Sequence, residues 1–440
     1  MITRISAAAL GVAATLTASP VLAQMQGMDH SQHDAAPPMA APAPQADPHA
    51  GHDMSQMGGM DMMPGGDEAA RSSGTSRLPA AEGPMRGLHW MPGDWMVMVH
   101  GYAWGVYSDQ GGPRGGSQAF VASMAMVQAS RDVSSKTRIQ FRTMLSAEPL
   151  MSARGYPNLF ATGETAGGLP LVDRQHPHDL FMELSARIDT DLGADTTAFL
   201  YGGPVGEPAL GPSAFMHRRS ARLNPEAPIS HHWLDSTHIT YGVVTAGLSG
   251  KRWQVEASAF RGREPDESRW DIETPKLDSW SVRATWMPSP NWAVSLSHGF
   301  LKDAEATHPG ENERRTIGAV HYADQRLAVT AAYSHKVHNG DAHGGFLAEA
   351  NWDITPRHAV FGRVETVENE ELFEAPDPLA GRSFTVTKAT LGYGYTIPFG
   401  LMSLTLGGSA SLYAKPSALD VAYSSNPKSF TLFAKLALGS

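Results

Sequence analysis

A tract near the N-terminus is packed with methionine and histidine. Residues 24–66 contain these metal-binding side chains: Met25, Met28, Met39, Met54, Met57, Met60, Met62, Met63, His30, His33, His49 and His52. The residues between them are mostly Gly, Pro, Ala, Ser and Asp, which cannot build a core. Thioether sulfur and imidazole nitrogen are donors that copper ions prefer. The tract therefore predicts a copper-binding segment, and a composition-biased linker that holds no ion is the alternative.

The donors of the tract form two groups, at residues 25–33 and 49–63. Within each group several side chains can reach one ion. Thioethers bind without losing a proton, so their affinity does not depend on pH. A flexible chain loses conformational entropy when it wraps an ion. We therefore expect modest affinity for several exchangeable copper ions, as Cu(I), Cu(II) or both.

A second set of histidines lies in or beside two of the longest connections in the chain. They are His176 and His178 in the sequence DRQHPHD, and His231, His232 and His238 in the sequence SHHWLDSTH. Neighbouring imidazoles can bind a metal, and Asp179 or Asp235 could orient them. Alternatively, the linker 202–235 folds into the lumen as a plug and the histidines make structural hydrogen bonds. A weaker candidate group is predicted in an outer loop: His335, His338 and His343.

The same region allows an enzyme as a further alternative. Some barrels hydrolyse lipid with a Ser-His pair on the outer face, and Ser236 lies close in sequence to His231, His232 and Asp235. The chain has no nucleophile-elbow spacing there, so the residue types stand without a motif. The glycine-rich stretch 111–116 precedes no helix pattern and is typical of a turn. We therefore predict that the protein is not an enzyme.

The composition indicates an exported protein. Residues 1–23 have the charge, short apolar stretch and small residues of a signal peptide, with cleavage expected after Ala23. The chain has no cysteine, which excludes disulfides and thiolate metal sites. Its net charge of −10 does not favour a nucleic-acid partner. The partners that we expect are outer-membrane lipid, a metal ion, periplasmic copper-handling proteins and further copies of the chain.

From residue 94 onward the chain alternates apolar and polar residues in short segments. In 251–262, for example, Trp253 and Val255 share one face, while Gln254 and Glu256 share the other. The same alternation predicts sixteen strands: 96–107, 117–130, 136–146, 178–190, 195–201, 236–248, 251–262, 279–288, 291–301, 315–324, 326–336, 345–355, 358–366, 383–396, 402–413 and 429–438. Aromatic residues at the ends of the apolar faces are typical of transmembrane strands.

The connections between these strands alternate between short and long. Bacterial outer-membrane barrels have short periplasmic turns, long outer loops and an even number of strands. We therefore predict a signal peptide (1–23), a disordered periplasmic Met/His-rich segment (24–93) and an all-β, antiparallel transmembrane β-barrel of about 16 strands (94–440). A soluble all-β protein is the alternative. The chain lacks the terminal aromatic residue that many such barrels carry.

The order of signal, Met/His-rich tract and barrel resembles the copper-resistance protein B family of outer-membrane proteins. Three barrel stretches, 173–183, 207–217 and 231–247, resemble uncharacterised exported proteins associated with metal-resistance genes. The resemblance implies an outer-membrane copper context and no mechanism. We expect a copper-tolerance protein whose periplasmic tract binds copper and whose barrel passes or anchors it. The alternative is a general porin or solute channel with an incidental tail, and a lipid hydrolase is a third hypothesis.

Overall fold

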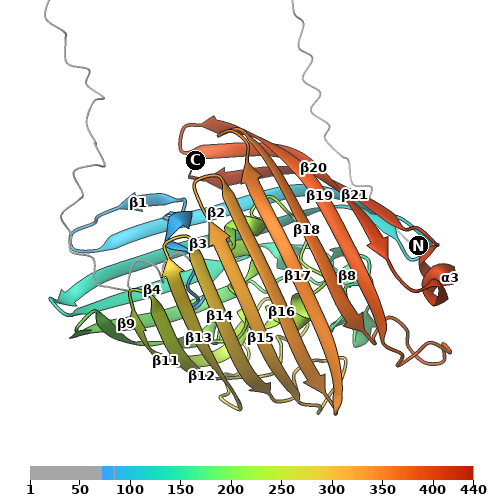
Figure 1. The fold of residues 1–440 in the computed structure, drawn as a ribbon, viewed down its shortest axis with the longest axis horizontal. Helices are drawn as coiled ribbons and strands as arrows, with labels where there is room; N and C mark the ends of the chain where they lie inside the picture. The colour runs from blue at the N-terminus through green and yellow to red at the C-terminus, as the bar shows by residue number, and fades with distance from the viewer. Residues whose placement is uncertain (1–71, 84, 440) are drawn as a thin grey trace, which may run out of the picture. The chain divides into compact units, whose positions relative to one another are not determined.

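The computed structural model describes residues 72–83 and 85–439 (Figure 1). The predicted signal peptide and all the donors of the Met/His-rich tract lie outside the described residues. No helix within the described ranges is long and apolar enough to cross a membrane.

Sixteen antiparallel strands close into a barrel, as the alternation predicts. They are β2 (Met96–Gln110), β3 (Gly116–Ser134), β4 (Thr137–Leu145), β9 (Phe181–Gly193), β10 (Thr196–Gly206), β11 (Thr240–Gly250), β12 (Trp253–Phe260), β13 (Ser279–Ser289), β14 (Trp292–Leu301), β15 (Glu313–Ala323), β16 (Leu327–His338), β17 (Asp341–Asp353), β18 (His358–Asn369), β19 (Phe384–Phe399), β20 (Met402–Ala414) and β21 (Lys428–Leu438). Pairing of β2 with β21 closes the barrel, and a short strand β1 (Leu88–Trp90) pairs with the start of β2.

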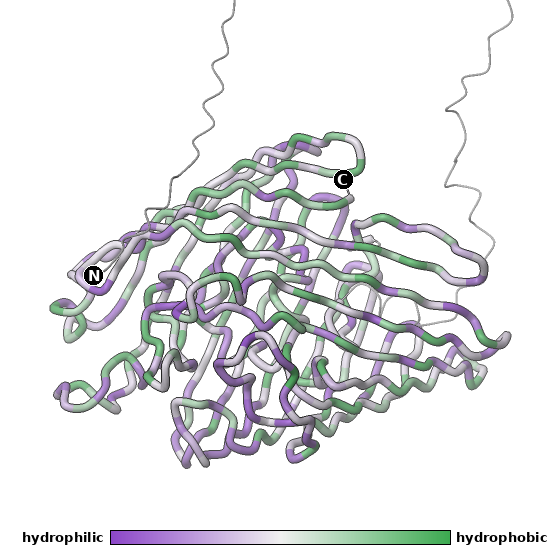
Figure 2. Tube along the Cα trace, turned by 180° about the vertical axis from the view of Figure 1, so that it is seen from behind, coloured by the Kyte–Doolittle hydropathy of each residue, from purple (hydrophilic) through white to green (hydrophobic). Residues whose placement is uncertain are grey.

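Hydrophilic and hydrophobic residues are interspersed along the strands (Figure 2), and the apolar side chains of the barrel lie outside while the charged ones lie inside. On β12 and β13, Trp253 and Val282 are exposed, whereas Glu256 and Arg283 are buried and form an ion pair of 2.8 Å. A soluble protein places these two classes the other way round. An apolar outer face with a polar lumen is the pattern of a transmembrane barrel. The soluble all-β alternative is therefore wrong.

Arginine on the outer face should cost stability in a way that an apolar residue does not. Val282 is 45% exposed and lies between Trp280 and Trp286 on the outer face of β13. We expect Val282→Arg to destabilise the folded barrel by about 2–4 kcal/mol, because the charge must enter hydrocarbon. Val282→Leu, the control, should change stability by less than about 1 kcal/mol. Unfolding of both variants in lipid vesicles measures this, and equal stabilities would contradict the assigned face.

The connections divide the barrel into a short-turn end and a long-loop end. Most hairpins at the first end have turns of two to four residues, such as 194–195 and 251–252, and both β2 and β21 have their terminal ends there. The long-loop end carries the connections 146–180, 207–239, 261–278, 302–312, 370–383 and 415–427. One predicted outer loop is absent, because β16 and β17 extend to a two-residue turn at Asn339-Gly340.

The connection 207–239 folds into the lumen and forms a plug. Almost all of its residues are buried, and its polar groups bond to strands around the wall. Arg218 pairs with Glu349 on β17 (2.7 Å), and Glu226 pairs with Lys388 on β19 (2.8 Å). The hydroxyl of Ser230 donates to Glu365 on β18 (2.9 Å). The predicted linker 202–235 therefore lies in the lumen as a plug. The structural role that this alternative gives to its histidines stays a prediction.

The N-terminal boundary of the ordered part lies earlier than predicted. Residues 72–77 are buried inside the barrel, although the segment 24–93 is predicted to be disordered. The hydroxyl of Thr75 donates to Glu256, and the backbone N–H of Ala81 donates to Pro290 at the short-turn end. This segment, which we call the N-terminal arm (72–83), therefore rises from the short-turn end to the middle of the lumen. Its polar residues find partners there, which composition alone could not indicate.

Candidate metal centre in the barrel lumen

Two connections, 146–180 and 207–239, bring all five predicted barrel histidines together. His176 and His178 come from the first, and His231, His232 and His238 come from the second. Ring centroids lie 6.2 Å apart for His176 and His232, 5.3 Å for His178 and His238, and 5.1 Å for His231 and His238. All five side chains are buried. We call this group the histidine cluster.

Local structure around these histidines differs from the predicted strands in two places. His178 precedes β9, which begins at Phe181, so Pro177 and the loop set its direction. His231 and His232 begin the one-turn helix α2 (His231–Leu234), and Ser236–His238 forms a 3-10 turn before β11. The chain changes direction at Asp235 between these two turns, and the rings of His231 and His238 lie 5.1 Å apart between centroids. An extended strand from residue 236 would have separated them.

Four of the five imidazoles have their Nδ1 atom held by an oxygen. The pairs are His178 Nδ1 with Glu148 Oε2 (2.9 Å), His231 Nδ1 with Asp235 Oδ1 (2.8 Å), His238 Nδ1 with the Asp235 carbonyl oxygen (2.8 Å) and His176 Nδ1 with the Pro177 carbonyl oxygen (3.0 Å). A carbonyl or carboxylate oxygen accepts, so Nδ1 carries the proton. In a neutral imidazole the Nε2 atom then has a free lone pair. Metal-binding histidines are oriented in this way.

Two of those Nε2 atoms have no partner. They are the buried Nε2 atoms of His178 and His238, whereas the Nε2 atom of His176 lies 3.3 Å from Glu164 Oε1. Burying such a group without a partner costs about 1–3 kcal/mol, and most buried polar atoms in proteins are therefore bonded. A water molecule or a metal ion beside these two atoms would supply the missing partner.

Carboxylates complete two overlapping sets of donors. Atoms of Glu164, His176 and His232 lie within 4.8 Å of one another, and so do atoms of His232, Glu264 and Glu305. All of these residues are buried. The Nε2 atom of His176 is 3.3 Å from Glu164 Oε1, and the Nδ1 atom of His232 is 3.1 Å from Glu264 Oε1. Nitrogen and carboxylate donors in this number suit a transition metal ion.

Burial and nearby charges act in opposite directions on these groups. Burial lowers the pKa of His176 well below its usual range, and the positive charge of Arg269 lowers it further. Burial also opposes protonation of His232, but the carboxylates of Glu264 and Glu305 outweigh it and raise its pKa. Arg269 bonds to Glu164 (2.9 Å) and Asp179 (3.2 Å). The predicted partner Asp179 therefore holds Arg269, whereas Asp235 orients His231 as predicted.

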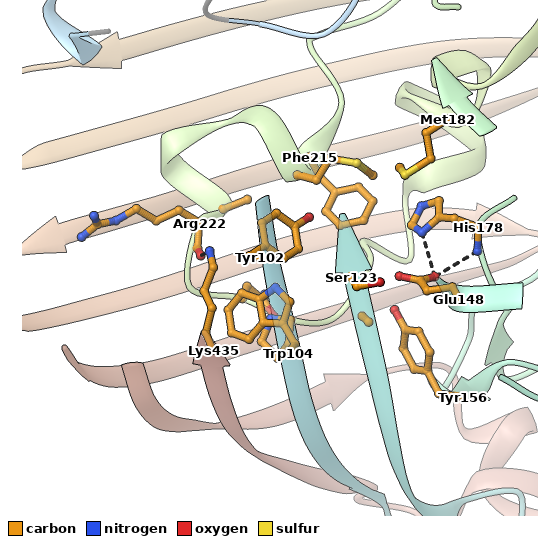
Figure 3. A pocket seen from close by; sticks show the side chains of 15 residues that line it. Tyr102, Trp104, Ser123, Glu148, Tyr156, His178, Met182, Phe215, Arg222 and Lys435 are labelled. Carbon is orange, nitrogen blue, oxygen red and sulfur yellow. Dashed lines mark hydrogen bonds and ion pairs between the residues drawn. The ribbon is translucent and has the colours of Figure 1, made fainter. Parts of the chain in front are cut away.

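A small cavity of about 40 Å³ lies beside the cluster, and Figure 3 shows its lining. Glu148 and His178 form one side of it, joined by the hydrogen bond drawn in the figure. Met182 and Phe215 lie next to them, and Lys435 lies on the opposite side. The volume holds about one or two water molecules or a single ion.

Further donor groups extend from the histidine cluster toward the long-loop end. Glu305, His308 and Glu371 form one group, and His308, Glu311 and His338 form the next. The second group lines a cavity of about 290 Å³. Of the weaker predicted histidines, His338 and His343 are buried near acidic side chains, whereas His335 faces outward and belongs to no such group. The glutamates in these groups come from two loops, 302–312 and 370–383, and no sequence motif marks them.

The arrangement of Ser236 does not suit a lipid hydrolase. Its side chain is buried inside the barrel, and its hydroxyl oxygen accepts a hydrogen bond from Arg315 (2.7 Å). A lipid-hydrolysing serine must face the outer surface. Asp235 pairs with His231 but also with Arg218 (2.8 Å), which ties it to the plug.

Comparison with known proteins identifies the architecture. No family model matches the sequence, and no curated protein matches it. The solved structure of Salmonella typhi OmpF in complex with daunomycin matches with a TM-score of 0.51 and 9% sequence identity, covering 80% of this chain and 100% of that chain. The anion-selective porin from Comamonas acidovorans matches with a TM-score of 0.48 and 8% identity, covering 78% and 100%. The outer membrane channel DcaP of Acinetobacter baumannii matches with a TM-score of 0.46 and 10% identity, covering 80% and 100%.

The chain therefore has the fold of an outer-membrane porin. Its apolar outer face is the surface that contacts lipid.

Proposed function

We propose that the protein is an outer-membrane channel-type barrel whose cargo is a copper ion. The porin-like fold supports the channel part of the proposal, and the comparisons carry no information on copper. One observation supports the metal part: the buried donors of Glu164, His176 and His232 lie within 4.8 Å of one another, beside the unpartnered Nε2 atoms of His178 and His238. Imidazole suits copper, and copper binds N/O sites more tightly than the other common divalent ions of the first row.

The Met/His-rich tract has a role as the collecting segment in this proposal. Its donors lie outside the described residues, so their chemistry rests on the sequence. The chain that follows the tract supports the connection, because Ser72 is already buried in the lumen and its carbonyl oxygen accepts a hydrogen bond from Arg142 (3.1 Å). Copper bound by the tract is thereby tethered to the barrel that contains the histidine cluster. The copper-resistance protein B resemblance stands as a part of this proposal.

The linked donor groups give the cargo a direction. Each group shares one residue with the next: His232 joins the first to the second, Glu305 the second to the third, and His308 the third to the fourth. The fourth group lines the cavity at the long-loop end. Along such a series an ion exchanges one ligand at a time and keeps at least one protein ligand throughout. If the long loops face outward, as they do in bacterial outer-membrane barrels, this series leads out of the cell.

A general solute channel with an incidental tail is the second candidate. The porin-like fold favours it. Its test is conductance: an open channel should pass large currents that copper does not alter. The plug 207–239 gives the opposite expectation, a small current in the unmodified protein.

Copper titration of the full-length protein tests the proposal. A tract variant carries Ser at the eight methionines and Asn at the four histidines of residues 25–63 and keeps the chain length. We expect it to lose the weakly held ions and to keep tightly bound copper in the barrel. The control replaces Asp29, Asp34 and Asp53 by Asn and should bind as the unmodified chain does, because soft ions do not prefer carboxylates. Unchanged copper per chain in the tract variant would show that the tract is incidental.

A further inference from the structure

Seven methionines gather in one part of the lumen, next to the histidine cluster. They are the buried Met98, Met124, Met126, Met144 and Met182 and the partly buried Met85 and Met216. These are seven of the twelve methionines that follow residue 71. We call this group the methionine chamber. It spans the neighbouring strands β2, β3, β4 and β9, and Met126 is the direct cross-strand partner of Met144.

The position of the methionine chamber is unusual for a barrel. Lumen faces of outer-membrane barrels are polar, and elsewhere on this wall they carry pairs such as Glu256 with Arg283. Methionine often fills gaps in apolar cores. Five of the eight fully buried members of the group are methionines, and the other three are Val205, Ile239 and Tyr241. The partly buried Tyr102, Phe181, Leu184 and Ile272 pack against them, so methionine is the commonest residue of the group and supplies its sulfur.

A histidine of the plug adds a nitrogen donor to the methionine chamber. The Nε2 atom of His217 is 3.3 Å from Met144 Sδ. Burial lowers the pKa of His217 to about 3, with smaller contributions from His100 and Arg142, so the imidazole is neutral. The guanidinium of Arg142 on the same wall is paired with the carboxylate of Glu183 (3.4 Å). Thioether sulfur and imidazole are donors that suit a soft monovalent ion such as Cu(I).

We propose that the methionine chamber with His217 is a binding site for a soft monovalent cation, Cu(I) or Ag(I). It is separate from the histidine cluster, whose nitrogen and carboxylate donors suit a divalent ion.

The methionine chamber and the histidine cluster share one cavity. Met182 and Met216 line the same 40 Å³ space as His178 and Glu148. Figure 3 labels Met182 beside His178 and Glu148. The N-terminal arm approaches from the other side, where Arg142 bonds to the first described residue, Ser72. The methionine chamber therefore lies between the chain that follows the tract and the histidine cluster. Its role as an entry site for copper rests on the proposed function, whereas its affinity for a soft ion does not.

Titration of the full-length chain with Ag(I) tests the site. The tract variant serves as background, because it keeps the chain length and removes the competing tract donors. We expect it to bind Ag(I) at the methionine chamber, and Met126→Leu, Met144→Leu and Met182→Leu together should weaken that binding at least about 100-fold. Leucine has nearly the same volume, so packing should survive. Met287→Leu, at a buried methionine of β13 outside the methionine chamber, is the matched control and should bind as the background does.

Two further measurements keep the result decisive. X-ray absorption of the silver-loaded background should show sulfur neighbours around Ag(I), and this needs no variant of the methionine chamber. Nitrogen and oxygen neighbours alone would overturn the site, as would equal Ag(I) affinity in the background and the triple leucine variant. The pair His176→Asn and His232→Asn should weaken Cu(II) binding and leave Ag(I) binding intact. If this variant binds neither ion, no separate soft site exists. If it binds both ions as tightly as the background does, the histidine cluster is not the Cu(II) site, and the proposal for the methionine chamber is unaffected.

Discussion

Replacing Arg218 by alanine will loosen the plug and raise the ionic current through the barrel. Arg218 is fully buried and holds three partners: Asp235 (2.8 Å), Glu349 (2.7 Å) and the Ser213 carbonyl oxygen (2.8 Å). Removing it leaves Asp235 without its guanidinium partner and Glu349 with Arg363 alone. Removing one partner of a buried ion pair costs about 3–5 kcal/mol. A large part of this free energy is lost from the state in which the plug is packed in the lumen.

Single-channel recording in planar bilayers measures this effect. Lys251→Ala is the control, because Lys251 makes its ion pair with Asp195 (3.0 Å) on the exposed short-turn end, away from the plug. Surface pairs contribute about 0–1 kcal/mol, so this control should leave both the current and the unfolding transition nearly unchanged. A current in Arg218→Ala equal to that of the unmodified protein, with unchanged stability, would contradict the assignment of residues 207–239 as a plug.

The second large effect is on copper binding. Asparagine at both His176 and His232 removes two of the three donors in the group with Glu164. A site of four ligands binds a transition ion with about 10–16 kcal/mol, or roughly 3 kcal/mol for each ligand. Loss of two ligands should therefore weaken Cu(II) binding by at least about 10³-fold.

The matched control for this pair is His335→Asn. His335 is a histidine of the weaker predicted group, but its side chain faces outward from β16. Competition titration with a chelator of known affinity measures all three proteins in the tract-variant background. If His335→Asn lowers the affinity as much as the double variant does, copper binds at the outer surface and the histidine cluster is not the site.

Most of the fold could be predicted from the sequence, because the barrel follows directly from local alternation. Each strand places one side chain in lipid and the next in the lumen, so Trp253 and Glu256 reveal their faces without any long-range information. All sixteen predicted strands are present, with ends that differ by a few residues. The exceptions depend on tertiary contacts. Residues 72–77 are ordered because Arg142, Glu256 and Arg283 provide partners inside the barrel.

The candidate site could be predicted only in part. The histidines stand out as the pairs HPH and HH, and their grouping in one cluster required only that two loops enter the lumen. Glu164, Glu264 and Glu305 come from three different connections, and each resembles an ordinary loop residue in the sequence. The methionine chamber could not be predicted either, since five of its methionines lie on four different strands, alternating with unrelated residues, and the other two lie in connections. Strand pairing alone brings them together.

The location of copper inside the barrel is the most direct test of the account. Crystals of the full-length protein soaked with Cu(II) should give an anomalous-diffraction peak at the copper edge between Glu164, His176 and His232. The same peak should be absent from crystals of the His176→Asn, His232→Asn variant. Copper peaks confined to the outer surface, or no peak within the lumen, would contradict the proposal that this barrel binds copper at its histidine cluster.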